Sequence, residues 1–204
     1  MTRFLCFMLF TLSAGLPAWA QDVIHARIQT SMGDIDVALD AERAPIGTEN
    51  FLAYAESGAY DRVIWHRVIP ETLIQGGGYN AFYFKRPVRD PIPNEANGLR
   101  NERGTLAWAR LDDPDSADSQ FFINLRHNDS LDRTGDRFDY QAGYSVFGRV
   151  VAGMAVADAI GGVATGPGPE DSPFAAEVPV EPVLILRVDR IDADEVGATQ
   201  GAGE

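Results

Sequence analysis

Cysteine is almost absent from this sequence, which contains a single one, Cys6. It lies in an apolar stretch, residues 4–16, that follows the positively charged Arg3 and precedes Ala18-Trp19-Ala20. This order is typical of a secretory signal peptide, so we expect residues 1–20 to be removed on export to the periplasm. The mature chain would then lack cysteine, which excludes disulfides, thiol nucleophiles and thiolate metal sites.

Long apolar runs are lacking as well. The stretch near the N-terminus is interrupted by Thr11, Ser13, Gly15 and Pro17, and it is shorter than the roughly 20 residues needed to span a bilayer. An uncleaved membrane anchor is therefore the weaker interpretation. No later segment could cross a membrane, so we expect no membrane association after cleavage.

Basic residues are few compared with acidic ones. The formal net charge is −13 and becomes −14 once Arg3 is removed. Such a surface repels phosphate backbones, so we expect no nucleic-acid partner. The acidic runs at residues 112–115 and 129–139 are interpreted as solvated loops. Calcium binding is the alternative, but the acids do not follow a calcium-loop spacing.

The motifs of conventional active sites are missing. His25, His66 and His127 are scattered, and no His-Glu-x-x-His pair or cysteine cluster is present, so we predict no metal site. Residues 143–148 do not form a nucleophile elbow, and the glycines at 76–78 lack the ending of a phosphate loop. A hydrolase, an oxidoreductase or a nucleotide-dependent enzyme is not supported, and we expect no cofactor.

Short apolar segments separated by turn residues make up most of the chain. Alternating apolar residues predict a β-hairpin over residues 24–40, with Met32-Gly33-Asp34 between its strands. Helices are predicted from Pro45 to Gly58 and over residues 154–160. Further strands are predicted at residues 62–69, 73–75, 105–109, 120–124, 145–150 and 183–191.

This pattern indicates a mainly β fold, a closed antiparallel β-barrel capped by two α-helices, because strands and helices do not alternate regularly. We assign residues 21–192 to one domain and residues 193–204 to a disordered acidic tail. The long segments 79–103 and 112–119 are expected to be loops, and loops of that length are usually functional.

Polar side chains occur at three places in or beside these apolar strands, at Arg67, Gln75 and Gln120. Each could simply face water at a sheet edge or a barrel end. Together they could line one apolar groove in which Arg67 is a fixed hydrogen-bond donor. Such a site has no nucleophile and no general base, so it suits a reaction that breaks no covalent bond.

At these residues the sequence resembles the cyclophilins. The shared motifs occur in the family's order over residues 24–191: Asn50-Phe51, Trp65-His66-Arg67-Val68-Ile69-Pro70, Gln75-Gly76-Gly77, Ser119-Gln120-Phe121-Phe122-Ile123, and the segment 146–154. The segments 94–95 and 104–110, together with Tyr144, are similar to the periplasmic bacterial branch.

The resemblance implies an eight-stranded barrel and a peptidyl-prolyl cis–trans isomerase that acts on proline-containing polypeptides and assists the folding of exported proteins. The catalytic residues that it implies are Arg67, Gln75 and Phe122. The substrate-binding residues that it implies are Leu73, Ala109, Arg110, Gln120, Leu131 and Tyr144. No cofactor is needed, and nothing demands more than a monomer.

Two positions depart from the family pattern. Thr72 stands where the family usually has a phenylalanine of the proline pocket, and Glu71 replaces the preceding glycine. Ser130 stands where the family has tryptophan or another aromatic residue. The alternative is therefore a proline-binding or chaperone-like module with weak turnover, unless Phe82, Tyr83 or Phe84 fills the pocket.

Overall fold

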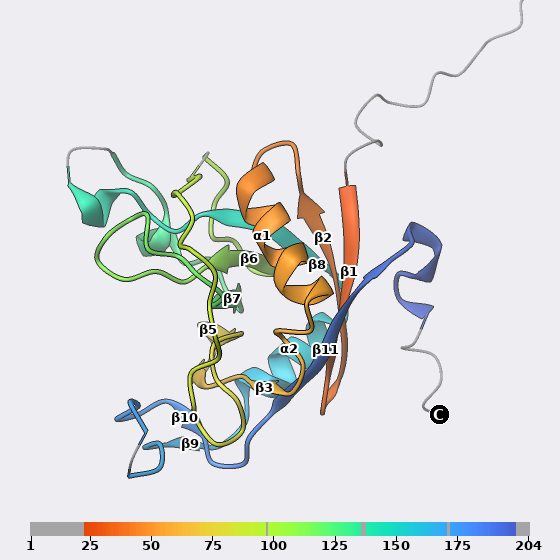
Figure 1. Ribbon diagram of the computed structural model, residues 1–204, viewed down its shortest axis with the longest axis vertical. Helices are drawn as coiled ribbons and strands as arrows, with labels where there is room; N and C mark the ends of the chain where they lie inside the picture. The colour runs from red at the N-terminus through yellow and green to blue at the C-terminus, as the bar shows by residue number, and fades with distance from the viewer. Residues whose placement is uncertain (1–22, 97, 136–137, 171, 199–204) are drawn as a thin grey trace, which may run out of the picture.

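The computed structural model describes residues 23–96, 98–135, 138–170 and 172–198 (Figure 1). The proposed signal peptide, residues 1–20, lies outside the described residues. Within the described part of the chain, no helix is both long enough and apolar enough to span a membrane.

The secondary structure consists of short strands and two α-helices. The strands are β1 Val23–Thr30, β2 Gly33–Asp40, β3 Val63–Ile64, β4 Arg67–Ile69, β5 Leu73–Gly76, β6 Thr105–Trp108, β7 Phe121–Asn124, β8 Val146–Ala152, β9 Thr165–Gly166, β10 Val178–Pro179 and β11 Leu184–Ile191. The helices are α1 Pro45–Glu56 and α2 Met154–Gly161, and 3-10 turns lie at Asp129–Leu131, Asp139–Gln141 and Ala193–Glu195.

Most predicted elements are confirmed within one or two residues. The turn of the first hairpin lies at residues 31–32, slightly before the predicted position. Thr30 closes it, because its hydroxyl donates to the Gly33 carbonyl at 2.6 Å and accepts from the Met32 amide at 3.0 Å. The pair β9–β10 was not predicted, because two-residue strands are too short to show alternation.

The main sheet has nine strands in the order β3-β11-β1-β2-β8-β6-β7-β5-β4, and all neighbouring strands are antiparallel. Its two edge strands, β3 and β4, are halves of the one strand predicted at residues 62–69, interrupted at Trp65 and His66. The sheet therefore curls back on itself. The predicted barrel is confirmed with one difference: strand pairing does not close it between β3 and β4.

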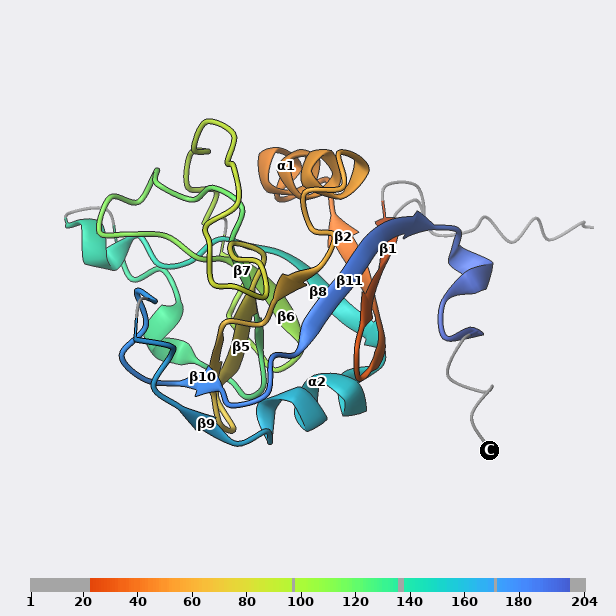
Figure 2. The same ribbon diagram turned by 60° about the horizontal axis from the view of Figure 1, so that its bottom comes forward.

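The two helices lie at opposite ends of the curled sheet (Figure 2), α1 against β2, β8 and β11 and α2 against β2, β4 and β5. Pro45 begins α1, and a distant carboxylate caps it: Glu95 accepts hydrogen bonds from the amides of Ile46 at 3.0 Å and Gly47 at 2.6 Å. A negative group is favourable at this end of a helix. The contact also ties the loop after β5 to α1.

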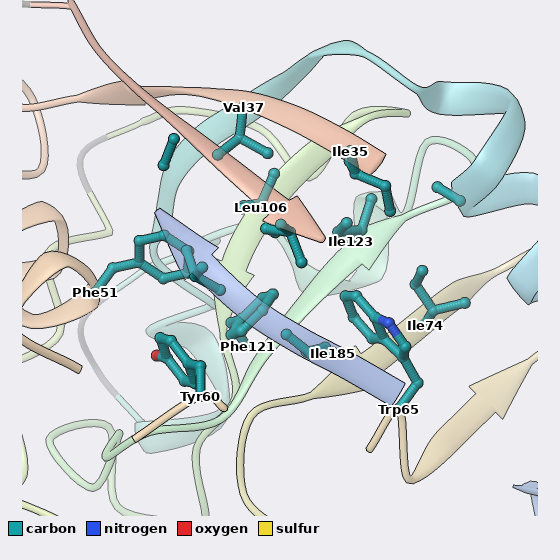
Figure 3. Close-up of a cluster of buried hydrophobic side chains, with 14 of the residues drawn as sticks. Ile35, Val37, Phe51, Tyr60, Trp65, Ile74, Leu106, Phe121, Ile123 and Ile185 are labelled. Carbon is teal, nitrogen blue, oxygen red and sulfur yellow. The ribbon is translucent and has the colours of Figure 1, made fainter. Parts of the chain in front are cut away.

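The interior of the curled sheet is filled by apolar and aromatic side chains (Figure 3). The Phe51 ring from α1 lies 5.3 Å from the Phe121 ring, and Trp65 lies 5.6 Å from Phe121 on the other side. All three side chains are fully buried. Edge-to-face contacts of this kind add to the stabilisation from burial.

The first residues of the expected disordered tail, from Ala193 on, have a defined structure. Ala193–Glu195 form a 3-10 turn with a capping box between Asp192 and Glu195. Beyond it, the Gly197 amide donates to the Asp36 carboxylate at 2.7 Å. Asp36 is fully buried and also accepts from Arg27 at 2.7 Å, so this segment covers a buried ion pair. Residues 199–204 lie outside the described residues.

Candidate active site

The outer face of the sheet carries a transverse row of paired residues. Arg67 on β4 pairs with Gln75 on β5, and Gln75 pairs with Phe122 on β7. Phe122 pairs with Ala107 on β6, and Ala107 pairs with Val146 on β8. Paired residues of antiparallel strands share a face, whereas their chain neighbours point the other way, here into the core (Figure 3). The row therefore brings Arg67, Gln75 and Phe122 together, as predicted.

The polar end of this row is a chain of hydrogen bonds. The Arg67 Nη1 donates to Gln75 Oε1 at 3.5 Å, and Gln75 Nε2 donates to Gln120 Oε1 at 3.1 Å. On the other side, Arg67 Nε donates to the carboxylate of Glu177 at 2.7 Å. The Arg67 side chain is 42% exposed, so the guanidinium is held in place yet reachable from solvent.

Glycines allow the close approach of the segment that follows β5. Gly77 has a φ of +90°, and a β-carbon there would lie 2.6 Å from the Ser119 carbonyl oxygen. A β-carbon on Gly78 would lie 2.6 Å from Cγ of Gln120. A larger residue at position 78 would therefore displace Gln120 from its place beside Gln75, and one at position 77 would clash with the backbone of Ser119.

The apolar end of the row belongs to a second cluster, which we call the outer cluster. Its buried members are Leu73, Ala107, Phe122 and Val146, and the half-buried residues packed against it are Ile69, Leu99, Ala109, Leu131 and Tyr144. The Phe122 and Tyr144 rings lie 5.7 Å apart, nearly perpendicular at 76°. Every apolar residue predicted for substrate binding thus lies in one place.

Arg110, also predicted to bind substrate, supports this cluster. Its guanidinium donates to the carbonyl oxygens of Gly143, Leu111, Asp112 and Asp139 at 2.8–3.2 Å. The same group lies 4.8 Å from the centre of the Tyr144 ring. Four hydrogen bonds to the chain and the contact with the Tyr144 ring therefore place Arg110 at the edge of the outer cluster.

His66 lies beneath the row and is 1% exposed. Its ring packs against Tyr79 at 4.9 Å and Phe174 at 5.1 Å. Burial lowers the pKa of His66 to about 4, and the neighbouring Arg67 charge acts in the same direction. The imidazole is therefore neutral near pH 7, and Arg67 is the cation of the row.

Comparison with known proteins gives the family. Residues 25–190 match the family described as "Cyclophilin type peptidyl-prolyl cis-trans isomerase/CLD". The chain belongs to the cyclophilin family. Its activity is accordingly the cis–trans isomerisation of X-Pro peptide bonds.

Two bacterial relatives are similar to this chain over most of their length. Peptidyl-prolyl cis-trans isomerase A of Dickeya dadantii is 45% identical over 177 residues, 86% of this chain and 89% of the relative. Peptidyl-prolyl cis-trans isomerase B of Escherichia coli is 46% identical over 160 residues, 78% of this chain and 94% of the relative.

A solved structure is similar in fold. The Cryptosporidium parvum cyclophilin, determined in the presence of the dipeptide Ala-Pro, has a TM-score of 0.64 and 23% identity, covering 82% of this chain and 99% of that one.

The described residues contain no group of three or more histidine, cysteine or acidic side chains arranged to hold a metal ion.

Sequence reasoning missed a buried asparagine network behind the outer cluster. Asn124 Nδ2 donates to Asn101 Oδ1 at 3.2 Å, and Asn128 Nδ2 donates to Asn124 Oδ1 at 2.7 Å. Asn101 Nδ2 also donates to the Leu131 carbonyl at 3.1 Å. This network fixes Leu131, whose carbonyl also accepts from the Tyr144 amide at 2.9 Å. Asparagines are common in loops, so no sequence signal set these apart.

The two residues that depart from the family pattern are accessible to solvent. Thr72 is half-exposed, and Ser130 is exposed. Phe82 and Phe84 are 77% and 70% exposed, so they do not fill the missing aromatic wall. Tyr83 packs instead near Phe174, with ring centres 6.3 Å apart.

Proposed function

We propose that Arg67 is the catalytic residue of this isomerase and that the outer cluster holds the proline ring of the substrate. One observation carries the proposal: a single row across β4, β5 and β7 has the guanidinium of Arg67 at one end, and the buried Phe122 ring follows on the same face, separated from it by Gln75. A positioned donor next to an apolar surface is what an X-Pro dipeptide requires.

The chemistry follows from the peptide bond. Rotation about it meets a barrier of ~18–20 kcal/mol because of amide resonance. At the twisted transition state, the prolyl nitrogen becomes pyramidal and regains its lone pair. Arg67 donates a hydrogen bond to that lone pair, and this bond is unavailable in the planar ground state, so it lowers the barrier selectively.

The other site residues have supporting roles in this proposal. Phe122, with Leu73 and Leu131, holds the proline ring while the preceding residue rotates. Gln75 and Gln120 orient Arg67 from one side, and Ala109 lies on the segment that holds the substrate backbone. The chain acts as a monomer on proline-containing polypeptides.

An isomerisation assay on an X-Pro peptide tests the assignment. We expect Arg67→Ala to lower kcat/KM by about 10²–10³-fold, as for the loss of a transition-state donor. Arg187→Ala is a matched control, because Arg187 is an exposed strand arginine paired with a carboxylate, Asp189, at 2.7 Å. The kcat/KM of the control should stay within about twofold of wild type.

Equal rates for wild type and Arg67→Ala would refute the assignment. No turnover in either, with retained peptide binding, would favour a proline-binding module.

We also propose that the protein is exported and acts on exported proteins in the periplasm. The support is the order of charge, apolar stretch and small residues within residues 1–20. Cell fractionation of the full chain and of a variant without residues 2–20 tests this. The full chain should be periplasmic and shortened at its N-terminus, and the variant cytoplasmic. An unshortened full chain in the cytoplasm would contradict the proposal.

A further inference from the structure

Glu177 is paired with Arg67 although 110 residues separate them in the sequence. The Arg67 Nε donates to Glu177 Oε2 at 2.7 Å, whereas the contact of Nη1 with Gln75 is longer, at 3.5 Å. Among the described residues, Glu177 is the one carboxylate that forms an ion pair with Arg67. The shortest hydrogen bond to the guanidinium is therefore not made by any residue of the family motifs.

The backbone of Glu177 is itself fixed to the strand that carries Arg67. Its carbonyl oxygen accepts from the Val68 amide at 2.7 Å, and β10, which follows it, packs against β4. Three residues earlier, the Phe174 ring packs against His66 and Tyr79. The segment that presents Glu177 is thus anchored on both sides of the carboxylate.

Glu177 has an uncommon backbone conformation, with a φ of +65°. Residues with a β-carbon are strained in this region, and such strain persists where the surroundings impose it. The ion pair adds too little to the free energy of folding to offset this strain, because the two side chains are 42% and 40% exposed. Pairs this exposed contribute little to folding.

We propose that Glu177 is a positioning residue that fixes the plane of the Arg67 guanidinium for catalysis. With Nε bonded to the carboxylate and Nη1 directed at Gln75, two sides of the guanidinium are fixed, and Nη2 has no partner among the described residues. Nη2 is then the nitrogen of Arg67 that is left to donate to a substrate. This role rests on the proposed function of Arg67.

For catalysis, the orientation that Glu177 gives to the Arg67 guanidinium matters more than the negative charge that Glu177 adds. The prolyl nitrogen offers a lone pair and no net charge, so what Arg67 must supply is a well-aligned hydrogen bond. A misplacement of about 1 Å at a catalytic group costs about 10²-fold in rate. The carboxylate lowers the net positive potential of the site, but it removes the rotational freedom of a long side chain.

Two substitutions separate orientation from charge. In Glu177→Ala the acceptor is lost, and we expect kcat to fall about 10- to 100-fold with KM within about twofold. In Glu177→Gln the amide oxygen can still accept from Nε, so kcat should stay within about threefold of wild type. The Nε–H resonance of Arg67 in NMR spectra should stay protected from exchange in wild type and Glu177→Gln, and lose protection in Glu177→Ala.

Glu71→Ala and Glu71→Gln are the matched controls. Glu71 has nearly the same φ, +57°, is exposed, and lies at the other end of β4, in the turn to β5. Both controls should keep wild-type kcat and an unchanged Arg67 resonance. A thermal melt of each variant shows whether folding is retained.

Several outcomes would overturn the proposal. They are an unchanged kcat in Glu177→Ala, a Glu177→Gln variant as slow as Glu177→Ala, or an equal loss in the Glu71 variants. Arg67→Ala, measured in parallel, separates the two levels of inference. If Arg67→Ala abolishes turnover while Glu177→Ala is normal, only the role of Glu177 fails. If Arg67→Ala is itself normal, the proposed function and the role of Glu177 both fail.

Discussion

Acid should destabilise this protein through His66, and the size of the effect can be worked out from its burial. The ring is 1% exposed, and burial lowers its pKa to about 4. In the unfolded chain a histidine has a pKa of about 6.5. Between these values the unfolded state binds a proton that the folded state does not, so stability falls as the pH drops from about 6.5 to about 4.

The expected loss follows from the difference in pKa. Each pKa unit corresponds to about 1.4 kcal/mol, so the full effect is about 3 kcal/mol, of which about 2.5 kcal/mol is reached by pH 4.5. That is a sizeable fraction of the free energy of unfolding of an ordinary domain, about 5–15 kcal/mol. Above about pH 7 the contribution of His66 is complete and constant.

Urea unfolding of wild type and His66→Phe at pH 7.5, 5.5 and 4.5 measures this effect. Phenylalanine keeps an aromatic ring packed against Tyr79 and Phe174 but cannot titrate. Titrating carboxylates affect both proteins alike, so the difference between the two isolates the histidine. We expect wild type to lose about 2.5 kcal/mol relative to the variant between pH 7.5 and 4.5. Parallel stability curves would refute the reasoning, since they would mean that His66 binds a proton as readily in the folded state as in the unfolded state.

Three further predictions concern single positions. Thr72→Phe should lower KM for X-Pro peptides about fivefold at unchanged kcat, because half-burying a phenyl ring stabilises by about 1 kcal/mol; an unchanged KM in the isomerisation assay would place residue 72 outside the binding surface. Asp36→Asn should cost about 3–5 kcal/mol in urea unfolding, since it removes the buried negative charge that compensates the buried Arg27. Asp34 lies 3.9 Å from Arg27 and is only partly buried, so Asp34→Asn should cost far less. Glu71→Gly should raise stability by about 0.5–1 kcal/mol in the same assay, because it relieves a left-handed conformation at some cost in chain entropy; a loss would mean that the glutamate side chain makes a stabilising contact.

Local patterns were enough to predict the strands, whereas Phe122 and the apolar residues around it were assigned to the site by the resemblance to the cyclophilins. Alternation in β7 places Phe121 in the core and Phe122 outside, and the same alternation in β5 separates Ile74 from Gln75. Once the two strands pair antiparallel, the outward residues must become neighbours. The structure thus explains through strand pairing why residues that the family resemblance singled out lie in one row.

The partners that hold the row in place were beyond sequence reasoning. Glu177 comes from a loop rich in proline and glycine, and nothing in that loop indicates that one carboxylate returns to β4. The asparagines behind Leu131 are likewise joined only by tertiary packing. The interruption at Trp65 and His66 was also missed, because an apolar run shows no break where a strand merely bends.

Residues on paired strands and residues in connecting segments have different effects on the site. Arg67, Gln75 and Phe122 are fixed by strand pairing, so their geometry depends on the core that sets the register. Thr72 and Ser130 lie in connecting segments, where a change of side chain leaves that register intact. The loss of aromatic surface at these positions should therefore weaken substrate binding while leaving the alignment of Arg67 unchanged. A substitution that loosens Arg67 itself should lower kcat instead, whatever the affinity for the peptide.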